Sequence, residues 1–243
     1  MSMTITYCAQ QIRQYHPDLF LLSLFCPKER LRSVWAVVAV FLELRNIPFT
    51  VTEPHMGHIR VQWWRDSFQS MYAGHNWNHY ASEDLTNTIK RHNISCALFE
   101  EICTRQDLCL ENGLPKDGDS LKDYTQGMMV PLNKILLSIL EEEEEKSTRE
   151  TISNMYNFVD MLRIKKVRCS KNFQDKNKNA AWIKEALQAM QHIKKPHTSF
   201  LRAQKALIGI YAGQLKKVDY DLQHSSLDKP PAFKELRVWL GAL

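Results

Sequence analysis

Apolar residues recur along most of this chain at intervals of three and four, the spacing of one buried face of an α-helix. The spacing is clearest after Lys28, where it includes Leu31, Val34, Trp35, Val38, Phe41, Leu42 and Arg45. Pro48 and the β-branched residues after it are predicted to end this helix. No segment alternates apolar and polar residues as a strand does. The pattern predicts an all-α protein with roughly nine to eleven helices in a single domain, 1–243.

Further helices are predicted wherever the same spacing lies between Pro, Gly and polar runs. They cover residues 7–15, 18–25, 58–72, 84–92, 97–110, 120–140, 148–164, 180–193 and 199–218, with a short helix ending at Trp239-Leu240. Gly127 and Pro131 interrupt the segment 120–140, which is therefore expected to be kinked or broken. The basic segment 165–178 is predicted to be a loop.

The predicted helix 58–72 contains two adjacent tryptophans within Gln62-Trp63-Trp64-Arg65-Asp66. Helical spacing places Ile59, Trp63 and Tyr72 near one face. Charge at this density beside two indoles favours a helix that lines the inside of a bundle. A simpler interpretation makes both indoles core residues and makes Arg65 and Asp66 a local ion pair.

Composition narrows the class of protein without selecting a function. Apolar residues make up 44% of the chain and charged residues 24%, which is ordinary for a globular protein. The eight glycines form no nucleotide-binding loop, which disfavours Rossmann and P-loop folds. A net charge of +5 is compatible with RNA, an anionic membrane or an acidic protein partner.

No metal or cofactor site is predicted. The six cysteines include no CxxC pair and are expected to be reduced core thiols. His75 and His79 are four residues apart, but they lie in an Asn-rich segment without a carboxylate in register, so a loop is favoured. The five glutamates 141–145 are expected to form a solvated helix end or loop.

No transmembrane segment is predicted, because the longest apolar candidate, 34–44, is too short to cross a bilayer. The first residues lack the Arg-rich amphipathic pattern of a transit peptide. Targeting is therefore expected to be internal or cryptic, or to depend on a presequence that is missing here.

Three blocks of the chain resemble one family, the squalene/phytoene synthases. The first is 7–44, and the second is 53–66, in which Gly57-His-Ile-Arg60 precedes Gln-Trp-Trp-Arg-Asp66. The third and weaker block is 201–220, followed by Pro230-Pro231 and Trp239-Leu240. The second block is the most specific, and it is most similar to a branch that includes a mitochondrial assembly factor of respiratory complex I. The resemblance implies a single-domain isoprenoid (trans-prenyl) synthase-like helical bundle.

The resemblance also implies where catalytic chemistry would lie. Enzymes of this kind ionise a diphosphate that Mg²⁺ holds between two aspartate-rich helix segments, since Mg²⁺ takes hard oxygen ligands. Carboxylates four residues apart share a helix face. The first motif would fall within 41–50, where Glu43 is the one carboxylate, and the second within 157–166, where Asp160 has no partner four residues away. Basic residues follow Asp160, the opposite of what cation chelation needs.

We therefore expect a non-catalytic member of the family, without metal or cofactor, in which Glu43 and Asp160 are satisfied polar residues of a vestigial cavity. The leading hypothesis is an accessory factor of the mitochondrial matrix, or of the matrix face of the inner membrane, that binds protein components of complex I during its assembly. The residues expected to form the family's vestigial binding surface are Arg60, Gln62, Trp63, Trp64, Arg65 and Asp66.

Three alternatives remain at this level. The basic segment 163–178 could bind rRNA or ribosomal proteins in mitoribosome assembly, through contacts from Arg163, Lys165, Lys166, Arg168 and Lys171. The chain could be a prenyl transferase with degenerate metal ligands. It could also pair with a second prenyl-synthase-like subunit and contribute only architecture.

Overall fold

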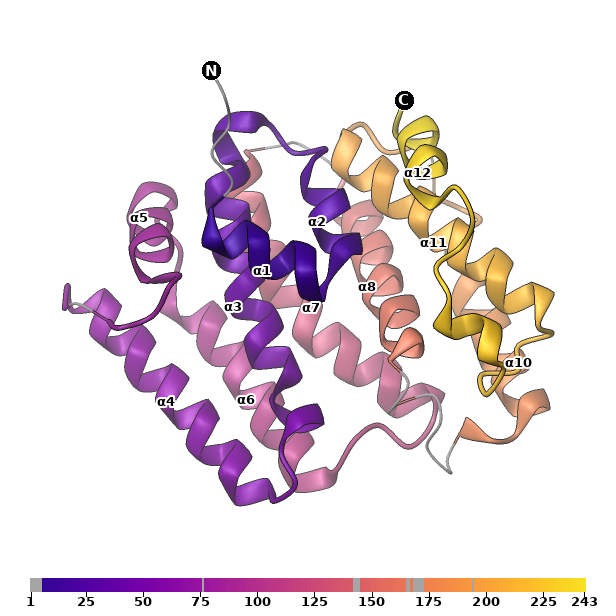
Figure 1. The fold of residues 1–243 in the computed structure, drawn as a ribbon, viewed down its shortest axis with the longest axis horizontal. Coiled ribbons are helices and arrows are strands. Elements are labelled where there is room, and N and C mark those ends of the chain that lie inside the picture. The colour runs from indigo at the N-terminus through magenta and orange to yellow at the C-terminus, as the bar shows by residue number, and fades with distance from the viewer. Residues whose placement is uncertain (1–5, 76, 142–144, 165–166, 168–172, 194) are drawn as a thin grey trace. The chain divides into compact units, whose positions relative to one another are not determined.

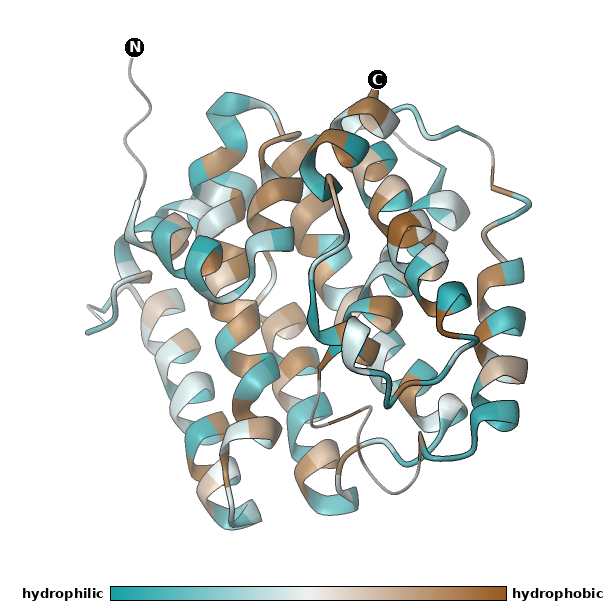
Figure 2. Ribbon diagram, turned by 45° about the vertical axis from the view of Figure 1, so that its right-hand side comes forward, coloured by the Kyte–Doolittle hydropathy of each residue, from teal (hydrophilic) through white to brown (hydrophobic). Residues whose placement is uncertain are grey.

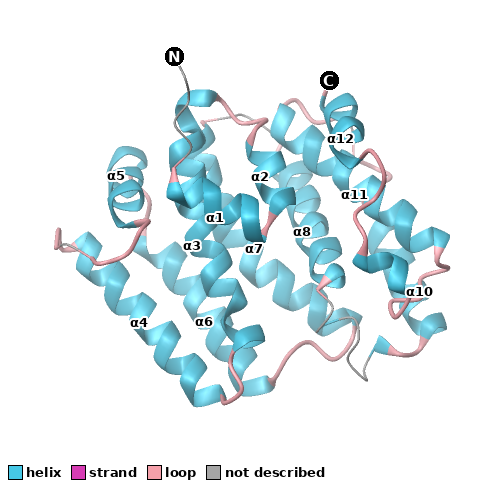
Figure 3. Ribbon diagram, viewed as in Figure 1, coloured by secondary structure: helices cyan, strands magenta, loops and turns pink. Residues whose placement is uncertain are grey.

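The computed structural model describes residues 6–75, 77–141, 145–164, 167, 173–193 and 195–243. The described residues form eleven α-helices and two short 3₁₀ helices, with no strand among them (Figures 1 and 3). The all-α prediction is confirmed. Contacts divide the chain into two compact units, residues 1–113 with 131–142 and residues 114–130 with 143–243. The prediction of a single domain, 1–243, stays a prediction.

The first unit contains six whole helices and the second half of a seventh. They are α1 (Tyr7–Tyr15), α2 (Pro17–Ser23), α3 (Leu31–Thr50), α4 (Pro54–Tyr72), α5 (Ser82–His92), α6 (Cys96–Asn112) and, beyond Pro131, α7 (Gly118–Leu140). The 3₁₀ turn η1 (Lys28–Arg30) leads into α3. α3 packs against α1, α4, α5 and α6 and is therefore the centre of this unit.

Helix α3 is buried over most of its length. Its indole Trp35 is enclosed and donates from Nε1 to Ser23 Oγ at 2.8 Å. The segment Lys28–Thr50 has the length and mean hydropathy, 1.3, of a membrane span, but 78% of the apolar window is buried inside the protein. Burial on this scale is typical of a core helix. Colouring by hydropathy shows both apolar and polar residues around most helices (Figure 2).

Proline lies inside two helices, α3 and α7, and α3 ends among the β-branched residues that were predicted to stop it. Helix α3 runs past Pro48 to Thr50, and the amide of Val51 still donates to Ile47 O at 3.3 Å. Helix α7 continues without a break through Pro131. A proline costs one backbone donor, and the packing on either side compensates for that loss. Of the two alternatives predicted for 120–140, the break is wrong and the kink stays a prediction; the division between the two units falls at Pro131.

The second unit contains the first half of α7, α8 (Lys146–Arg163), α10 (Lys176–Gln188), α11 (Ser199–Lys217), the 3₁₀ turn η3 (Ser225–Asp228) and α12 (Lys234–Ala242). Helix α10 starts four residues before its predicted start, because Asp175 caps it by accepting from the Lys178 amide at 3.0 Å. That end of the predicted loop 165–178 is therefore helical.

Helix α8 is the core of the second unit, and it carries a polar stripe. Between Ile152 and Leu162 every residue except Asn154 is buried. Ser153, Asn157 and Asp160 share one face, at spacings of four and three. Asn157 Nδ2 donates to the Thr125 carbonyl at 3.3 Å, and Ser153 Oγ lies 3.4 Å from Gln204 Oε1.

Substitution of two glycines in this unit by alanine is expected to change the free energy of unfolding in opposite directions. A Cβ at Gly118 would lie 2.5 Å from the Trp182 ring, whereas a Cβ at Gly209 would meet nothing within 4 Å. Gly118→Ala is expected to lower the free energy of unfolding by about 1–3 kcal/mol through overpacking. Gly209→Ala is expected to raise it by about 0.5–1 kcal/mol, because alanine loses less backbone entropy in a helix. Urea unfolding of both variants measures the direction of each change in the free energy of unfolding. Stabilisation by both substitutions would contradict the close approach of Gly118 to Trp182.

Candidate functional site

The Trp63-Trp64 helix, α4, buries one narrow stripe. Its buried positions are Gly57, Val61, Trp64, Ser67, Phe68 and Met71, and they pack mainly against α6. Trp64 is 4% exposed, whereas Trp63 is 45% exposed, and Ile59 and Tyr72 are also exposed. Ile59, Trp63 and Tyr72, which were expected near one face, are all exposed, so the expectation of a helix lining the inside of a bundle is wrong. Only one of the two indoles is a core residue.

Arg65 joins α4 to α6. Its Nε donates to Glu100 at 2.7 Å and its Nη1 to Asp107 at 2.6 Å, and Asp107 also lies 2.7 Å from His58 Nδ1. Burial disfavours the charged form of Arg65, but the hydrogen bonds to Glu100 and Asp107 outweigh this effect and raise its pKa. The local ion pair expected between Arg65 and Asp66 is wrong.

The other members of the signature make short-range contacts. Asp66 accepts from Gln62 Nε2 at 2.8 Å, and Arg60 donates to Thr50 Oγ1 at 3.2 Å. Both contacts are exposed. The polar residues of the block therefore attach α4 to its neighbours in sequence and space, and they do not converge on a common cavity.

A series of aromatic rings crosses this unit beside α4. Trp77 stacks on His79 with ring centroids 4.5 Å apart, and both rings contact Trp63 and Trp64 at 5.2–6.1 Å. His79 then contacts Tyr80 at 4.2 Å. The loop that supplies Trp77 and His79 was predicted, but its contacts with Trp63 and its role in covering Trp64 were not. The density of aromatic residues in His75-Asn-Trp-Asn-His-Tyr80 was the sequence feature that could have indicated these contacts.

Glu43 accepts hydrogen bonds from this aromatic series. The Tyr80 hydroxyl donates to Glu43 Oε1, and His79 Nε2 lies 3.3 Å from the same carboxylate. The Ala81 amide donates to His79 Nδ1 at 3.2 Å, so the proton of this imidazole is on Nε2, facing Glu43. Burial, assisted by Glu43, raises the pKa of Tyr80 far above its usual range. Glu43 is a satisfied polar residue, as expected.

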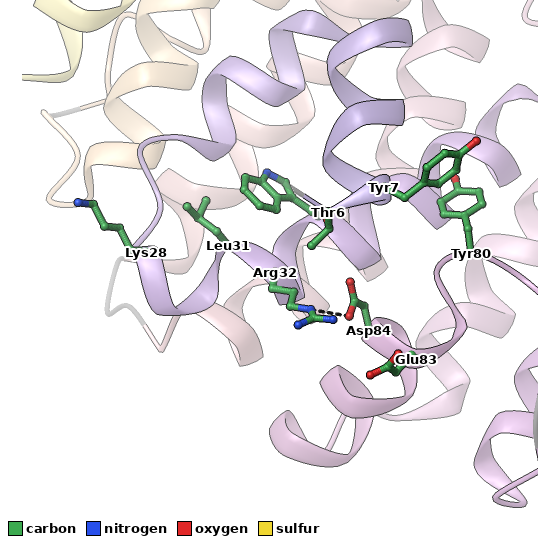
Figure 4. Close-up of a pocket in the computed structure, with 9 residues that line it drawn as sticks. Thr6, Tyr7, Lys28, Leu31, Arg32, Tyr80, Glu83 and Asp84 are labelled. Carbon is green, nitrogen blue, oxygen red and sulfur yellow. Dashed lines mark hydrogen bonds and ion pairs between the residues drawn. The ribbon is translucent and has the colours of Figure 1, made fainter. Parts of the chain in front are cut away.

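A pocket of about 520 Å³ opens beside Tyr80, between α1, α3 and α5 (Figure 4). Tyr7 and Tyr80 meet edge to face at one end, with centroids 4.9 Å apart, and Lys28 lies at the other. Arg32 and Asp84 form an ion pair at 2.6 Å across the wall. This mixture of charges suits a small polar ligand. It does not provide the converging carboxylates that hold Mg²⁺ between them.

The segment where the first metal motif would fall contains a buried cation. Arg45 is 2% exposed, and its guanidinium donates to His16 Nε2. A guanidinium stays charged at any physiological pH, so it opposes the binding of a divalent cation nearby. Within the described part of the chain, no three His, Cys, Asp or Glu side chains are arranged to hold a metal ion.

The predicted basic segment is only partly described. Lys165, Lys166, Arg168 and Lys171 lie outside the described residues. Arg163 donates to the Tyr211 hydroxyl at 2.7 Å, with its guanidinium 4.0 Å from the ring centroid. Lys176 pairs with Asp219 at 2.9 Å. Arg163 and Lys176 therefore both have partners in their own unit. Asp160, three residues before Arg163 on α8, is buried.

The cysteines of the described segments are free thiols. Burial raises the pKa of Cys8 and Cys103 to about 12 and that of Cys109 to about 11, so all three stay protonated at neutral pH. Cys169 and the glutamates 142–144 lie outside the described residues. Glu141, at the start of the acidic run, pairs with Arg30 at 2.5 Å.

Several known proteins are similar to this chain over nearly its whole length. "NADH dehydrogenase (ubiquinone) complex I, assembly factor 6" of Mus musculus is 23% identical, over 96% of this chain and 80% of the relative. The protein of the same name in Bos taurus is 22% identical, over 98% and 82%. The crystal structure of a dehydrosqualene synthase superposes with a TM-score of 0.67 at 16% identity, covering 97% of this chain and 94% of that one.

The likeness to the dehydrosqualene synthase shows the fold and leaves the activity open. The expected isoprenoid synthase-like bundle is therefore confirmed at the level of the fold. The family model described as "Squalene/phytoene synthase" matches residues 12–162, more than half of the chain. This chain belongs to the squalene/phytoene synthase family.

Proposed function

We propose that this protein is a non-catalytic assembly factor for respiratory complex I and acts in the mitochondrial matrix. Relatives that span nearly the whole chain are named as assembly factors of that complex, which supports the role and its mitochondrial setting. Its partners are protein components of the growing complex. The alternative role at the ribosome stays a prediction, and no described contact favours it.

The observation that carries the non-catalytic part is the environment of Arg45 and Glu43. Both lie in the segment where the first Mg²⁺-binding motif would fall. One is a buried fixed cation and the other a carboxylate that already accepts from Tyr80. Stabilising the charge of a leaving diphosphate is the largest contribution that a metal clamp makes to such a reaction. Neither residue is available to hold Mg²⁺, because a guanidinium is not a metal ligand and the Glu43 carboxylate already accepts hydrogen bonds from the aromatic loop.

Deletion of the gene in its source cells tests the role. Assembled complex I, measured on native gels and as NADH oxidation relative to the other respiratory complexes, is expected to fall selectively. Reintroducing the wild-type chain is expected to restore it. Normal complex I after deletion would rule out the assembly role.

The double variant Glu43→Gln/Asp160→Asn tests the absence of catalysis in the same cells. Amides keep a hydrogen-bond acceptor for neighbours such as Tyr80 but are much weaker ligands for Mg²⁺. A scaffold is expected to restore complex I with this variant as fully as with the wild type. Failure of a stably folded double variant, together with Mg²⁺-dependent turnover of a prenyl diphosphate by the wild type, would show an enzyme instead.

A further inference from the structure

The last helix, α12, presents an apolar face that no described residue covers. Its inner side, Lys234, Val238 and Ala242, is buried, and a Cβ at Gly241 would lie 2.5 Å from Ala206 Cβ on α11. The outer residues are each more than half exposed, and they are Phe233, Leu236, Trp239, Leu240 and Leu243. Positions 236, 240 and 243 follow helical spacing, so the outer residues form one continuous stripe.

This stripe is held in place by the rest of the unit. Arg202 Nε donates to Ala242 O at 2.7 Å, and Lys195 Nζ donates to Leu243 O at 3.2 Å, so two cations satisfy carbonyls at the end of α12. At the other end, Phe233 is in the left-handed region with φ of 53° and is 78% exposed. A bulky residue with this backbone is uncommon, and here it holds an aromatic ring in solvent.

A cationic pocket of about 330 Å³ lies beside the stripe, between α11 and the loop 226–232. Lys217, Lys229 and Arg237 line it, and no carboxylate does. None of these three cations has an ion pair with a described residue. Gln214 Nε2 donates to Ser226 O at 2.8 Å and to Lys229 O at 3.0 Å, which fixes the loop that forms the pocket.

The same region of the sequence is also net basic. Residues 195–243 contain eight lysines and arginines against four aspartates and glutamates, a net charge of +4. A surface of this sign attracts phosphate groups before any contact forms.

We propose that this face, the α12 stripe together with the pocket of Lys217, Lys229 and Arg237, docks on a bilayer surface that contains anionic phospholipid. Aromatic and aliphatic side chains enter the boundary between headgroups and acyl chains, while the three cations bind headgroup phosphates. A nine-residue helix buries too little apolar surface to hold the protein alone. Membrane binding therefore needs both the apolar stripe and the three cations, and it is reversible. Aromatic side chains are enriched at the headgroup level of bilayers, where an apolar surface meets a polar one. An acidic protein partner would match the same cations, but a chain that binds only such a partner would bind neither kind of vesicle in the test below.

Vesicle sedimentation of the purified full chain tests this docking without complex I, so its outcome is independent of the assembly role. Vesicles of phosphatidylcholine alone are compared with vesicles in which one lipid in four is phosphatidylglycerol. The wild type is expected to bind the anionic vesicles at least about tenfold more tightly and to lose most of this preference in high salt. Equal binding to both kinds of vesicle, or binding to neither, would overturn the proposal.

Matched variants assign the binding to this face. Leu236→Asp/Leu240→Asp removes the stripe at exposed positions, and Lys217→Gln/Lys229→Gln/Arg237→Gln removes the cations. Each is expected to weaken binding to anionic vesicles about tenfold or more. The control Lys90→Gln/Arg91→Gln/Lys116→Gln removes the same charge from exposed sites elsewhere and is expected to change it less than about twofold.

Two results with these variants would contradict the proposal. The first is an equal loss of binding in the control, which would mean that net charge alone is sensed. The second is full competition by millimolar inorganic phosphate together with unchanged binding of the leucine variant, which would identify a site for a free anion.

Discussion

Trp64→Ala is expected to lower the free energy of unfolding by about 3–5 kcal/mol, the largest loss among the changes considered for α4. The Trp64 side chain is 4% exposed and packs against Phe68, Trp77 and His79 at centroid distances of 5.2–5.6 Å. Truncation removes the transfer free energy of a whole indole and leaves a cavity between α4 and the aromatic loop that neighbouring rings cannot fill. Urea unfolding followed by circular dichroism measures the loss.

Trp63→Ala is the matched control, since it makes the same chemical change one residue away. Trp63 is 45% exposed and contacts two of the same rings, Trp77 and His79. Its truncation leaves no enclosed cavity, so the expected cost is about 1 kcal/mol, the size of an aromatic pair contact. Equal losses for the two variants would show that the indoles are buried alike and would contradict the stripe assigned to α4.

Arg45→Ala is expected to lower the free energy of unfolding by about 3 kcal/mol. The variant loses a charge-assisted hydrogen bond to His16, worth about 1.5–3 kcal/mol, together with the packing of an enclosed aliphatic stem. The same measurement applied to Arg60→Ala supplies the control. Arg60 is exposed, so its loss is expected to stay within about 0.5 kcal/mol.

The Arg45→Ala result also tests whether a buried cation is part of the core in the segment where the first metal-binding motif would lie. If Arg45→Ala proves as stable as the wild type, the guanidinium does not belong to the folded core and does not oppose a metal clamp in this segment. A large loss means that a cation has become part of the packing where a carboxylate motif would lie. Reverting the chemistry would then require rebuilding the core around it.

The sequence by itself determined the fold class and the family. The spacing of apolar residues in α3 predicted a helix buried on one face, whereas the structure buries it on most of its sides. The helix continues past Pro48 because packing outweighs one lost hydrogen bond. The Gln62–Asp66 block identified the family because such a run of unlike residues is rare. The absence of paired carboxylates in the two expected segments is likewise a property of sequence alone.

Only the tertiary structure decided which residues of those segments act together. Helical spacing gives the angle between two side chains on one helix, but it cannot say which side meets a neighbouring helix. Trp63 and Trp64 were therefore indistinguishable until α6 and the loop of Trp77 covered one of them. Arg65 could pair with Asp66 by proximity, yet Glu100 and Asp107, over thirty positions away, offered two better placed carboxylates.

The packing of neighbouring elements also explains why the apolar stripe of α12 is exposed. In sequence, Leu236, Leu240 and Leu243 are as apolar as any core residue. The burial of Val238 and Ala242 and the close approach of Gly241 to Ala206 turn the opposite side of α12 inward. Burial is a property of the whole packing arrangement. A sequence pattern predicts that a stripe exists, whereas the neighbours of that stripe determine whether it becomes core or surface.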